Sequence, residues 1–382
     1  MATSKLKPPF RADHVGSLLR PPELLAARAK IDGAGLGGDG SVVKPQSLIE
    51  VERRSIRDAV AFQERLGLKA ITNGDFCNQT WFTDFFESLG NVRTAEDMDP
   101  PVFVDAAGNK KPSLKIWVDG KIAWPEGGIC VDDFKFLKSI TTKVPKVTLP
   151  SPLIFHRYGH RNRTDLAAYP TLDEFWADAV KAWRQELAAL AEAGCTFIQI
   201  DDTSWMALSD PRALKLHEER GEAVADVARL YRDVTQAILR DRPAGLTIGM
   251  HICRGNNQGK WTMQGPYEPF AEILFNDLDI DAYFLEYDSQ RAGDFAPLRF
   301  VPRGKKTIVL GLVTTKSGQL ETKDELKRRV DEATKYVPLD QLALSPQCGF
   351  ASVKQGNPLT MDDQERKLAL VVETAAEIWD DA

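Results

Sequence analysis

His251 and Cys253 are the residues of this chain whose types and spacing point most directly to chemistry. They lie two positions apart at the end of a strand-forming segment, residues 246–253, so their side chains point to the same face. An imidazole and a thiolate are both ligands of Zn²⁺. The pair predicts half of a zinc site, although two buried residues that share a face by coincidence are the commoner explanation of such a pair.

Two further residues could complete this site. Glu286 and Cys348 each lie near the end of another strand-like segment. Two thiolates, one imidazole and one carboxylate form a tetrahedral set that zinc accepts. The alternative is that the cysteines only pack in the core and that Glu286 pairs with Arg291. Because all four residues end predicted strands, we favour a zinc site.

A zinc ion held by these residues would activate a thiol. Glu286 is the weakest of the four ligands and would give way to the sulfur of a substrate. A free thiol has a pKa of about 8.5 and is mostly protonated at neutral pH, whereas a thiol bound to zinc is deprotonated. The site therefore predicts a thiolate nucleophile that needs no separate general base.

The elements that must position these residues are strands that alternate with helices. The strand-forming segments are residues 11–19, 70–75, 147–152, 197–202, 246–253, 281–287, 307–313 and 342–346. Eight apolar strands, nearly all followed by helical segments, predict an α/β protein whose parallel sheet closes into a (β/α)8 (TIM) barrel. An open doubly wound sheet is the alternative, but no Gly-x-Gly-x-x-Gly turn follows the first segment.

The segments between the strands have their own signals. Capping-box sequences predict helices that begin at Ser47, Thr171 and Thr322. Residues 33–40, rich in glycine, predict a surface loop. Residues 81–144 contain short alternating segments separated by proline and glycine, which predict a β-hairpin or meander inserted after the second strand. We therefore expect one domain, residues 1–382, with one β-rich insertion.

The carboxyl ends of the strands are where (β/α)8 barrels carry their catalytic residues. Five more polar residues follow predicted strands, namely Ser17, Asp75, Asp201, Asp202 and Lys316. We expect these side chains to converge with the zinc ligands at one end of the barrel.

Composition limits the partners of the protein. Lys plus Arg total 49 and Asp plus Glu 55, a net charge of −6, so there is no basic excess for a nucleic acid to neutralise. Neither a signal peptide nor a membrane-spanning stretch is evident. Five dispersed cysteines are not a disulfide framework, and we take Cys77, Cys130 and Cys195 as structural. We expect a cytoplasmic protein that binds small molecules, with homo-oligomerisation left open.

Taken together, these motifs resemble the catalytic half of cobalamin-independent methionine synthase. The matching residues are His251 to Cys253, Glu286 and Pro346 to Gly349, with residues 15–17, 73–75 and 198–201. Residues 284–293 and 344–351 are most similar to short, stand-alone members of the family, and the resemblance covers nearly the whole chain. It implies a (β/α)8 barrel in which zinc-activated homocysteine attacks the methyl group of a methylated folate, a methyltetrahydropteroyltriglutamate–homocysteine S-methyltransferase-like activity.

The resemblance also implies roles for single residues. By position, the zinc ligands would be His251, Cys253, Glu286 and Cys348. The carboxylate of the amino-acid substrate would be held by Val15, Gly16 and Ser17, and its ammonium group by Asp75 and Asp201. A turn or cap carboxylate is the alternative for Asp75, and a local backbone hydrogen bond is the alternative for Ser17.

The chain departs from the family in three respects. It has no match to the second, degenerate barrel of the long enzymes, nor to their Arg-Cys pair and second acidic residue linked to folate. Lys316 holds the place of their proton-donating His, and it could donate a proton, bind an anion or be solvated. Lys316 and Asp201 are our predicted catalytic residues. The alkyl donor stays open between a methylated folate and a methylated corrinoid.

Two other functions are compatible with the same residues. The zinc-activated thiol could open an epoxide, as in some relatives of this family, with Lys316 or a nearby Arg stabilising a sulfonate or developing alkoxide. A non-catalytic zinc-binding protein is the other alternative, but it leaves Asp75, Asp201 and Lys316 without a role.

Further side chains could border the site. Those after the second strand are Trp81, Phe82, Phe85 and Phe86, which could wall off a flat donor ring or pack under the insertion. Those after the third strand are His156, Arg157, Tyr158 and His160, which could bind an anionic group or pair with neighbouring carboxylates.

Overall fold

The structure is a computed structural model that describes residues 7–30, 44–99, 103–104 and 110–380. The predicted loop at residues 33–40 lies outside them. The strands are β1 (Ala70–Ile71), β2 (Gly90–Asp97), β3 (Phe103–Val104), β4 (Lys110–Lys111), β5 (Ser113–Ala123), β6 (Val144–Pro150), β7 (Phe197–Asp202), β8 (Thr247–Ile252), β9 (Ala282–Glu286), β10 (Thr307–Val313) and β11 (Leu342–Pro346). The α-helices are α1 (Pro22–Ala29), α2 (Gln46–Arg65), α3 (Thr83–Glu87), α4 (Val131–Ile140), α5 (Leu172–Glu192), α6 (Pro211–Glu219), α7 (Val224–Leu239), α8 (Lys323–Ala333) and α9 (Met361–Ile378).

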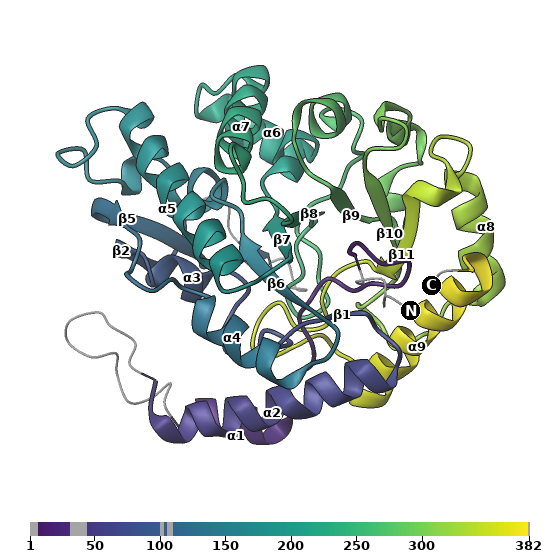
Figure 1. Cartoon of the computed structure of the whole chain (residues 1–382). Coiled ribbons are helices and arrows are strands. Elements are labelled where there is room, and N and C mark those ends of the chain that lie inside the picture. The colour runs from purple at the N-terminus through teal and green to yellow at the C-terminus, as the bar shows by residue number, and fades with distance from the viewer. Residues whose placement is uncertain (1–6, 31–43, 100–102, 105–109, 381–382) are drawn as a thin grey trace.

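Parallel strands in the order β1-β6-β7-β8-β9-β10-β11 form the central sheet, with the long helices around it (Figure 1). The six residues of β7 and the five of β9 are buried along their whole length. This is expected for parallel strands covered on both faces, and it explains their continuous apolar sequences. The α/β barrel class expected from the sequence is confirmed.

The first predicted strand, at residues 11–19, forms only an isolated parallel bridge between Ala12 and Leu344. Leu344 N–H donates to the carbonyl of Arg11, and on the other side Leu18 N–H donates to the carbonyl of Gly74. The segment therefore occupies the eighth position, between β11 and β1, although its pairing is too irregular to make a strand. Three polar residues of the segment form other hydrogen bonds, to side chains and loops, in place of regular pairing with the neighbouring strands: Asp13, His14 and Ser17.

Side chains from strands around the barrel meet in one buried cluster, made by Phe10, Ala70, Val144, Phe197, Ala282, Phe284, Val309 and Ala343. Residues so far apart in the sequence share one cluster because the curved sheet turns one face of each strand inward. A larger cluster fills the space between the sheet and its helices.

Between β1 and β6 the chain forms the antiparallel pair β2 and β5, which is separate from the central sheet. The last helix of this region, α4, packs on β6 and lies beside α2 and α5. Helix α4 therefore belongs to the outer ring of the barrel, and the antiparallel pair precedes it.

Two of the three predicted helix starts are observed. The side chains of Thr171 and Thr322 accept hydrogen bonds from the backbone N–H three residues later, at the starts of α5 and α8. The capping box predicted at Ser47 is wrong, because α2 begins at Gln46 after Pro45 and has no side-chain cap. Proline before the first turn fixes the backbone there and makes Ser47 an interior residue.

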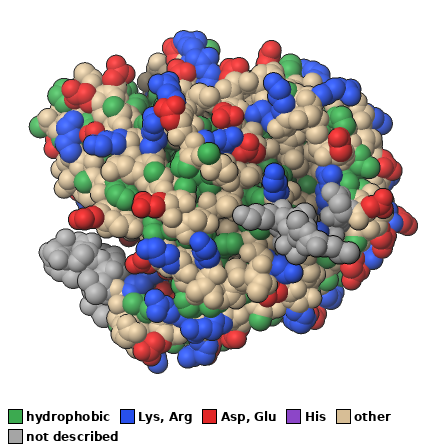
Figure 2. Space-filling model, in the orientation of Figure 1, with side chains coloured by type: hydrophobic (Ala, Val, Ile, Leu, Met, Phe, Trp, Pro, Cys, Tyr) green, Lys and Arg blue, Asp and Glu red, His purple; other side chains and the backbone are tan. Residues whose placement is uncertain are grey.

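Charged side chains of both signs are interspersed over the face of the molecule seen in Figure 2. Within the described residues, no helix has the length and apolar character needed to cross a bilayer.

Candidate active site

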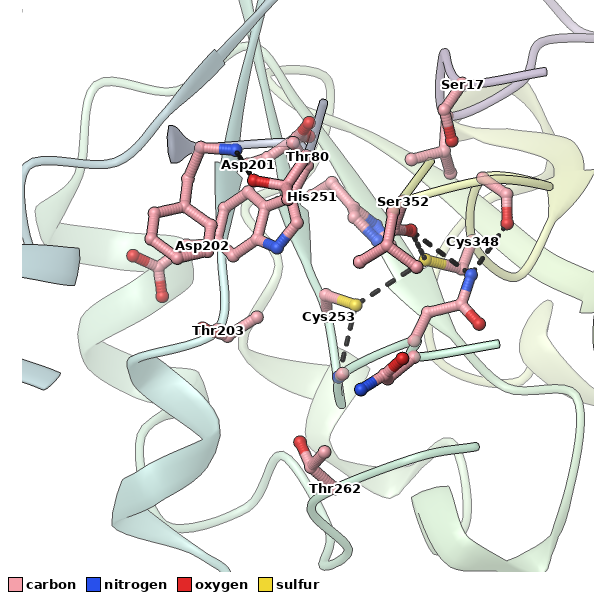
Figure 3. A pocket seen from close by; sticks show the side chains of 18 of the residues that line it. Ser17, Thr80, Asp201, Asp202, Thr203, His251, Cys253, Thr262, Cys348 and Ser352 are labelled. Atoms are coloured by element: carbon pink, nitrogen blue, oxygen red, sulfur yellow. Dashed lines mark hydrogen bonds between the residues drawn. The ribbon is translucent and has the colours of Figure 1, made fainter. Parts of the chain in front are cut away.

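Four side chains converge at the carboxyl ends of three barrel strands. His251 is in β8 with Cys253 just after it, Glu286 ends β9, and Cys348 follows β11. One ligand atom from each lies within 4.8 Å of the others, and the Sγ atoms of Cys253 and Cys348 are 3.5 Å apart. All four side chains are buried, and His251, Cys253 and Cys348 lie side by side in Figure 3. We call these four residues the ligand cluster.

The imidazole of His251 is oriented by the neighbouring strand. Its Nδ1 lies 3.1 Å from the carbonyl oxygen of Phe284, which can only accept a hydrogen bond, so Nδ1 carries the proton. Its Nε2 is buried and has no hydrogen-bond partner among the residues that the structure describes. A histidine fixed in this way by a backbone carbonyl presents a free lone pair, as metal-binding histidines do.

Glu286 is held by the loop after β8. Its Oε1 accepts a hydrogen bond of 2.7 Å from the backbone N–H of Arg254. The buried Arg254 side chain donates to the hydroxyl of Tyr267 and the carbonyl of Gly265, which fixes the loop. The carboxylate therefore has one oxygen bonded to the backbone, while the other, Oε2, accepts a long hydrogen bond of 3.5 Å from the side-chain amide of Gln347.

Lys316 lies beside this second oxygen. Its Nζ is 4.0 Å from Glu286 Oε2, is buried and, within the described part of the chain, has no hydrogen-bond partner. Burial alone would raise the pKa of Glu286, but Lys316, Arg254 and His251 together lower it. The structure thus places Lys316 next to the carboxylate of the ligand cluster and outside the lining of the adjacent cavity.

The two thiols and the imidazole shift one another's pKa values. A hydrogen bond with Cys253 holds the pKa of Cys348 well below its usual range, and the same contact raises the pKa of Cys253. Burial would lower the pKa of His251, but its contact with the Cys348 sulfur raises it to about 9. Buried groups this close need protons or a cation between them. Two thiols, an imidazole with a free lone pair and a carboxylate fit a zinc ion.

A cavity of about 180 Å³ opens beside the ligand cluster. His251, Cys253 and Cys348 line one part of it, and Ser17 and Asp201 line another. Figure 3 shows these side chains coming from separate segments of the chain to surround one space. Cys77, Cys130 and Cys195 do not line the cavity. Most of the residues predicted from strand ends therefore border one space.

The segment at residues 15–17 passes close to the loop that carries Cys348. The Ser17 hydroxyl accepts a hydrogen bond from the N–H of Ala351, so its partner is distant in sequence rather than local. A Cβ atom on Gly349 would lie 1.9 Å from the Ser17 Oγ, and one on Gly16, whose φ is 139°, would lie 2.7 Å from Thr148 Cγ2. Glycine at both positions permits this close approach.

Asp75 is held in an uncommon backbone conformation. Its φ is 60°, and its N–H donates to the Oδ1 of Asn73. The Thr148 hydroxyl donates to its carboxylate, and burial raises its pKa. A left-handed backbone at a non-glycine residue is costly, and such residues cluster at functional sites.

Asp201 faces the same cavity from the end of β7. The amide of Gln199 donates both to Asp201 Oδ1, at 2.7 Å, and to the carbonyl oxygen of Val15, at 2.6 Å. Burial raises the pKa of Asp201 to about 7, against the opposing effects of His251 and Gln199. Gln199 thereby ties Asp201 to the segment that contains Val15.

The residues after β1 and β6 divide between the cavity and the core. Trp81 and Phe82 line the cavity, whereas Phe85 and Phe86 pack against Trp183. After β6, the cavity is lined by Arg157 and Tyr158, while His156 and His160 contact Glu222 instead.

Several residues at this site were not predicted from the sequence. Gln199 and Thr148 orient the two carboxylates, and the amide of Asn256 donates to the carbonyl of Gly349. Gln199 lies two residues before Asp201 on one strand, so the period of two could have indicated it. Thr148 and Asn256 carried no such signal, because their partners, Asp75 and Gly349, lie in loops far away in the sequence.

Comparison with known proteins gives a consistent result. Residues 43–376 match the family model described as the catalytic domain of cobalamin-independent synthase. The chain is 39% identical over 374 residues to the protein YxjG of Bacillus subtilis, covering 98% of this chain and 96% of that protein.

A solved structure from Listeria monocytogenes, described as a vitamin-B12 independent methionine synthase, is similar with a TM-score of 0.74. It is 33% identical and covers 98% of this chain and 99% of that chain. The 5-methyltetrahydropteroyltriglutamate–homocysteine methyltransferase of Bacillus velezensis is 24% identical over 347 residues, 89% of this chain but 40% of that protein.

Proposed function

This chain belongs to the family of cobalamin-independent synthase catalytic domains, and on that premise we propose that it is a zinc-dependent thiol methyltransferase that makes methionine from homocysteine. The observation that carries the proposal is the ligand cluster, whose four ligand atoms lie within 4.8 Å of one another beside a cavity. The long methyltransferase relative named above supports the same chemistry.

His251, Cys253, Glu286 and Cys348 would hold the metal. When bound there, zinc would lower the pKa of a substrate thiol and so supply a thiolate at neutral pH. The chain itself contributes a fixed imidazole tautomer through Phe284 and a carboxylate whose second oxygen faces Lys316. We propose that Lys316 stabilises the charge of Glu286 throughout turnover. This role differs from direct proton donation to the substrate.

The amino-acid part of the substrate would lie in the part of the cavity lined by Ser17, Asp75 and Asp201. Asp75 and Asp201 are two buried carboxylates suited to an ammonium group. The attraction of its positive charge would offset the free energy lost when the carboxylates are removed from water. Ser17 and the backbone of residues 15–17 would take the carboxylate. Ser17 is placed for this by its contact with the loop after Cys348.

Metal analysis combined with an assay of thiol alkylation tests the proposal. We expect the purified protein to contain about one zinc ion per chain and to transfer a methyl group to homocysteine, because the four ligands form one closed set. Methyl-folate, methylcobalamin and a small epoxide would be compared as electrophiles. If only the epoxide alkylates the thiol, the function is epoxide opening and not methyl transfer. If the protein contains zinc but alkylates no thiol, it is a zinc-binding protein.

A cysteine variant with a matched control sharpens this test. Cys348→Ala should lower zinc affinity by more than about 100-fold, since loss of an outer-shell partner alone costs 10- to 100-fold. Cys195→Ala removes another buried cysteine, one whose Sγ donates to the carbonyl of Phe197, and should retain zinc and activity. A full equivalent of zinc and normal alkylation in Cys348→Ala would reject this ligand set.

A further inference from the structure

Gln347 is a buried amide beside the ligand cluster. It directly precedes Cys348, is 1% exposed and does not line the cavity. Its Nε2 lies 3.5 Å from Glu286 Oε2, which places the amide group against a proposed metal ligand. Because Gln347 lies outside the space that would hold the reactants, it can act on the reaction only through the ligands beside it.

The orientation of this amide is fixed by Thr315, in the loop after β10. The backbone N–H of Thr315 donates to Gln347 Oε1 at 2.7 Å, and its hydroxyl lies 2.8 Å from the same oxygen. A backbone N–H can only donate, so the amide oxygen faces Thr315 and the NH2 group faces the Glu286 carboxylate. Thr315 is held in turn by Asn357, whose side-chain amide donates to its carbonyl at 2.7 Å. Gln347 is therefore oriented as a donor to Glu286.

The backbone of Gln347 is fixed as well. Its N–H donates to the carbonyl of Val313 at 2.8 Å. A Cβ atom on Gly311 would lie 2.7 Å from the Gln347 Cα, so glycine there permits β10 to pack closely against the segment after β11. Backbone and side chain of Gln347 are thus both positioned by contacts other than the one with Glu286.

Gln347 and Lys316 make different contacts with Glu286 Oε2. Lys316 Nζ is 4.0 Å away, which is beyond a hydrogen bond, so it attracts the carboxylate without fixing its direction. The amide of Gln347 donates along a defined direction, at the long limit of a hydrogen bond. The other oxygen, Oε1, accepts from the Arg254 N–H. The carboxylate is thus held at Oε1 from the loop after β8 and at Oε2 from the segment after β11.

Resting on the metal ligands of the proposed function, we propose that Gln347 is a positioning residue for the metal site. It sets the direction of the Glu286 carboxylate relative to the neighbouring ligand Cys348. Hydrogen-bond partners that orient metal ligands typically contribute roughly 10- to 100-fold to metal affinity. Because Gln347 and Cys348 are adjacent in the chain, one short segment supplies both a thiolate and the group that aligns the carboxylate.

Gln347→Met tests the proposal, because methionine has a similar length and no hydrogen-bonding amide. Zinc affinity, measured by competition with a chromophoric chelator, should fall about 10- to 100-fold. The matched control is Gln341→Met, at the other end of β11. The Gln341 amide is also buried, and it donates to the carbonyls of Pro302 and Lys306. This control should lose stability to urea and keep the zinc affinity of the wild type.

Thr315→Val gives a second test that leaves Gln347 in place. Valine has the shape of threonine and keeps the backbone N–H, but the substitution removes the hydroxyl beside Gln347 Oε1. Zinc affinity should fall about fivefold, the usual net contribution of one hydrogen bond. In the Gln347→Met background the same substitution should cause no further loss, because the two side chains act through one contact.

The inference is overturned if Gln347→Met keeps the zinc affinity of the wild type, or if Gln341→Met loses as much affinity as Gln347→Met. If Gln347→Met does not fold, Thr315→Val decides alone, and unchanged affinity in that variant rejects the inference. These measurements need no turnover. A wild type that binds zinc but transfers no methyl group would reject the methyltransferase, and weaker zinc binding in Gln347→Met would still establish the positioning role. Methyl transfer with unchanged affinity in Gln347→Met would reject the inference and retain the proposed function.

Discussion

Cys253 and Cys348 bring their sulfurs to 3.5 Å although 95 residues separate them. At this distance two thiolates repel strongly, so the pair is stable only with a proton or a cation between them. A ring nitrogen of His251 and a carboxylate oxygen of Glu286 lie within 4.8 Å of both sulfurs. At the scale of single residues, these four side chains form an electrostatically unfavourable group that a bound divalent cation would stabilise.

Asp201→Asn tests the ammonium contact. We expect the KM for homocysteine to rise roughly 10- to 100-fold, the cost of losing a hydrogen bond to a charged group, with zinc content unchanged. Steady-state kinetics and metal analysis of the same preparation measure both. An unchanged KM would remove Asp201 from the substrate site, and a loss of zinc would show that the variant disturbs the ligand cluster instead.

Lys115→Met tests the burial of a cation beside the cavity. Burial lowers the pKa of Lys115 to about 7 from 10.5, so between these pH values the unfolded chain binds more protons and stability rises with pH. We expect urea denaturation to show that the free energy of unfolding of the wild type rises with pH over this range. Lys115→Met should be more stable than the wild type near pH 7, and its free energy of unfolding should rise less with pH.

The control for this prediction is Lys121→Met, which removes an exposed lysine from the same strand. It should keep the pH dependence of the wild type. If the free energy of unfolding rises equally with pH in the wild type and in Lys115→Met between pH 7 and 10, Lys115 does not cause the pH dependence.

At the scale of elements, the start of a helix holds the segment at residues 15–19 in place. Helix α9 begins at a capping box in which the Thr360 hydroxyl accepts from the N–H of Asp363, and the Asp363 carboxylate accepts from the N–H of Thr360. One residue further on, Gln364 Oε1 accepts a 2.7 Å hydrogen bond from the N–H of Leu19. The start of the last helix thus fixes the backbone two residues from Ser17.

Thr360→Ala should therefore affect more than the helix. We expect a loss of about 1 kcal/mol in the free energy of unfolding, the usual cost of an N-cap. The KM for homocysteine should rise with it if Gln364 holds Leu19 through this turn. Thr360→Ser keeps the hydroxyl and should restore both values, measured by urea denaturation and steady-state kinetics. Identical stability of the alanine variant would contradict the importance of the cap.

At the scale of the whole molecule, the barrel interior contains a buried ion pair. Lys146 Nζ lies 3.0 Å from Asp13 Oδ1, and both side chains are 0% exposed. Lys146 also donates to the carbonyl of His14 and lies 4.0 Å from the centre of the Phe284 ring. This pair joins the irregular first segment to β6 across the interior, where backbone pairing is sparse.

Lys146→Met should destabilise the protein by about 3–5 kcal/mol, because it leaves the Asp13 carboxylate buried without a counterion. The double variant Lys146→Met/Asp13→Leu should recover much of this loss, since it buries no unpaired charge. Urea denaturation of the two single variants and the double variant forms a cycle. Additive losses would show that the two side chains do not interact.

Much of the fold could be predicted from sequence because barrel strands buried on both faces are apolar along their whole length, as in residues 307–313. Helix starts were predictable where a Thr precedes the first turn, as at Thr171 and Thr322. The first strand was mispredicted because its backbone pairs only at Ala12, and pairing depends on neighbours that the local sequence does not show.

For the site, the sequence alone determined which residues lie at strand ends, because the side-chain period of two and the strand-helix alternation are local properties. Only the tertiary structure decided that the ligand atoms meet within 4.8 Å, that Lys316 lies beside Glu286 and that Arg157 lines the cavity. Those facts depend on the curvature of the sheet and on which loops pack together. Both come from contacts between residues far apart in the chain.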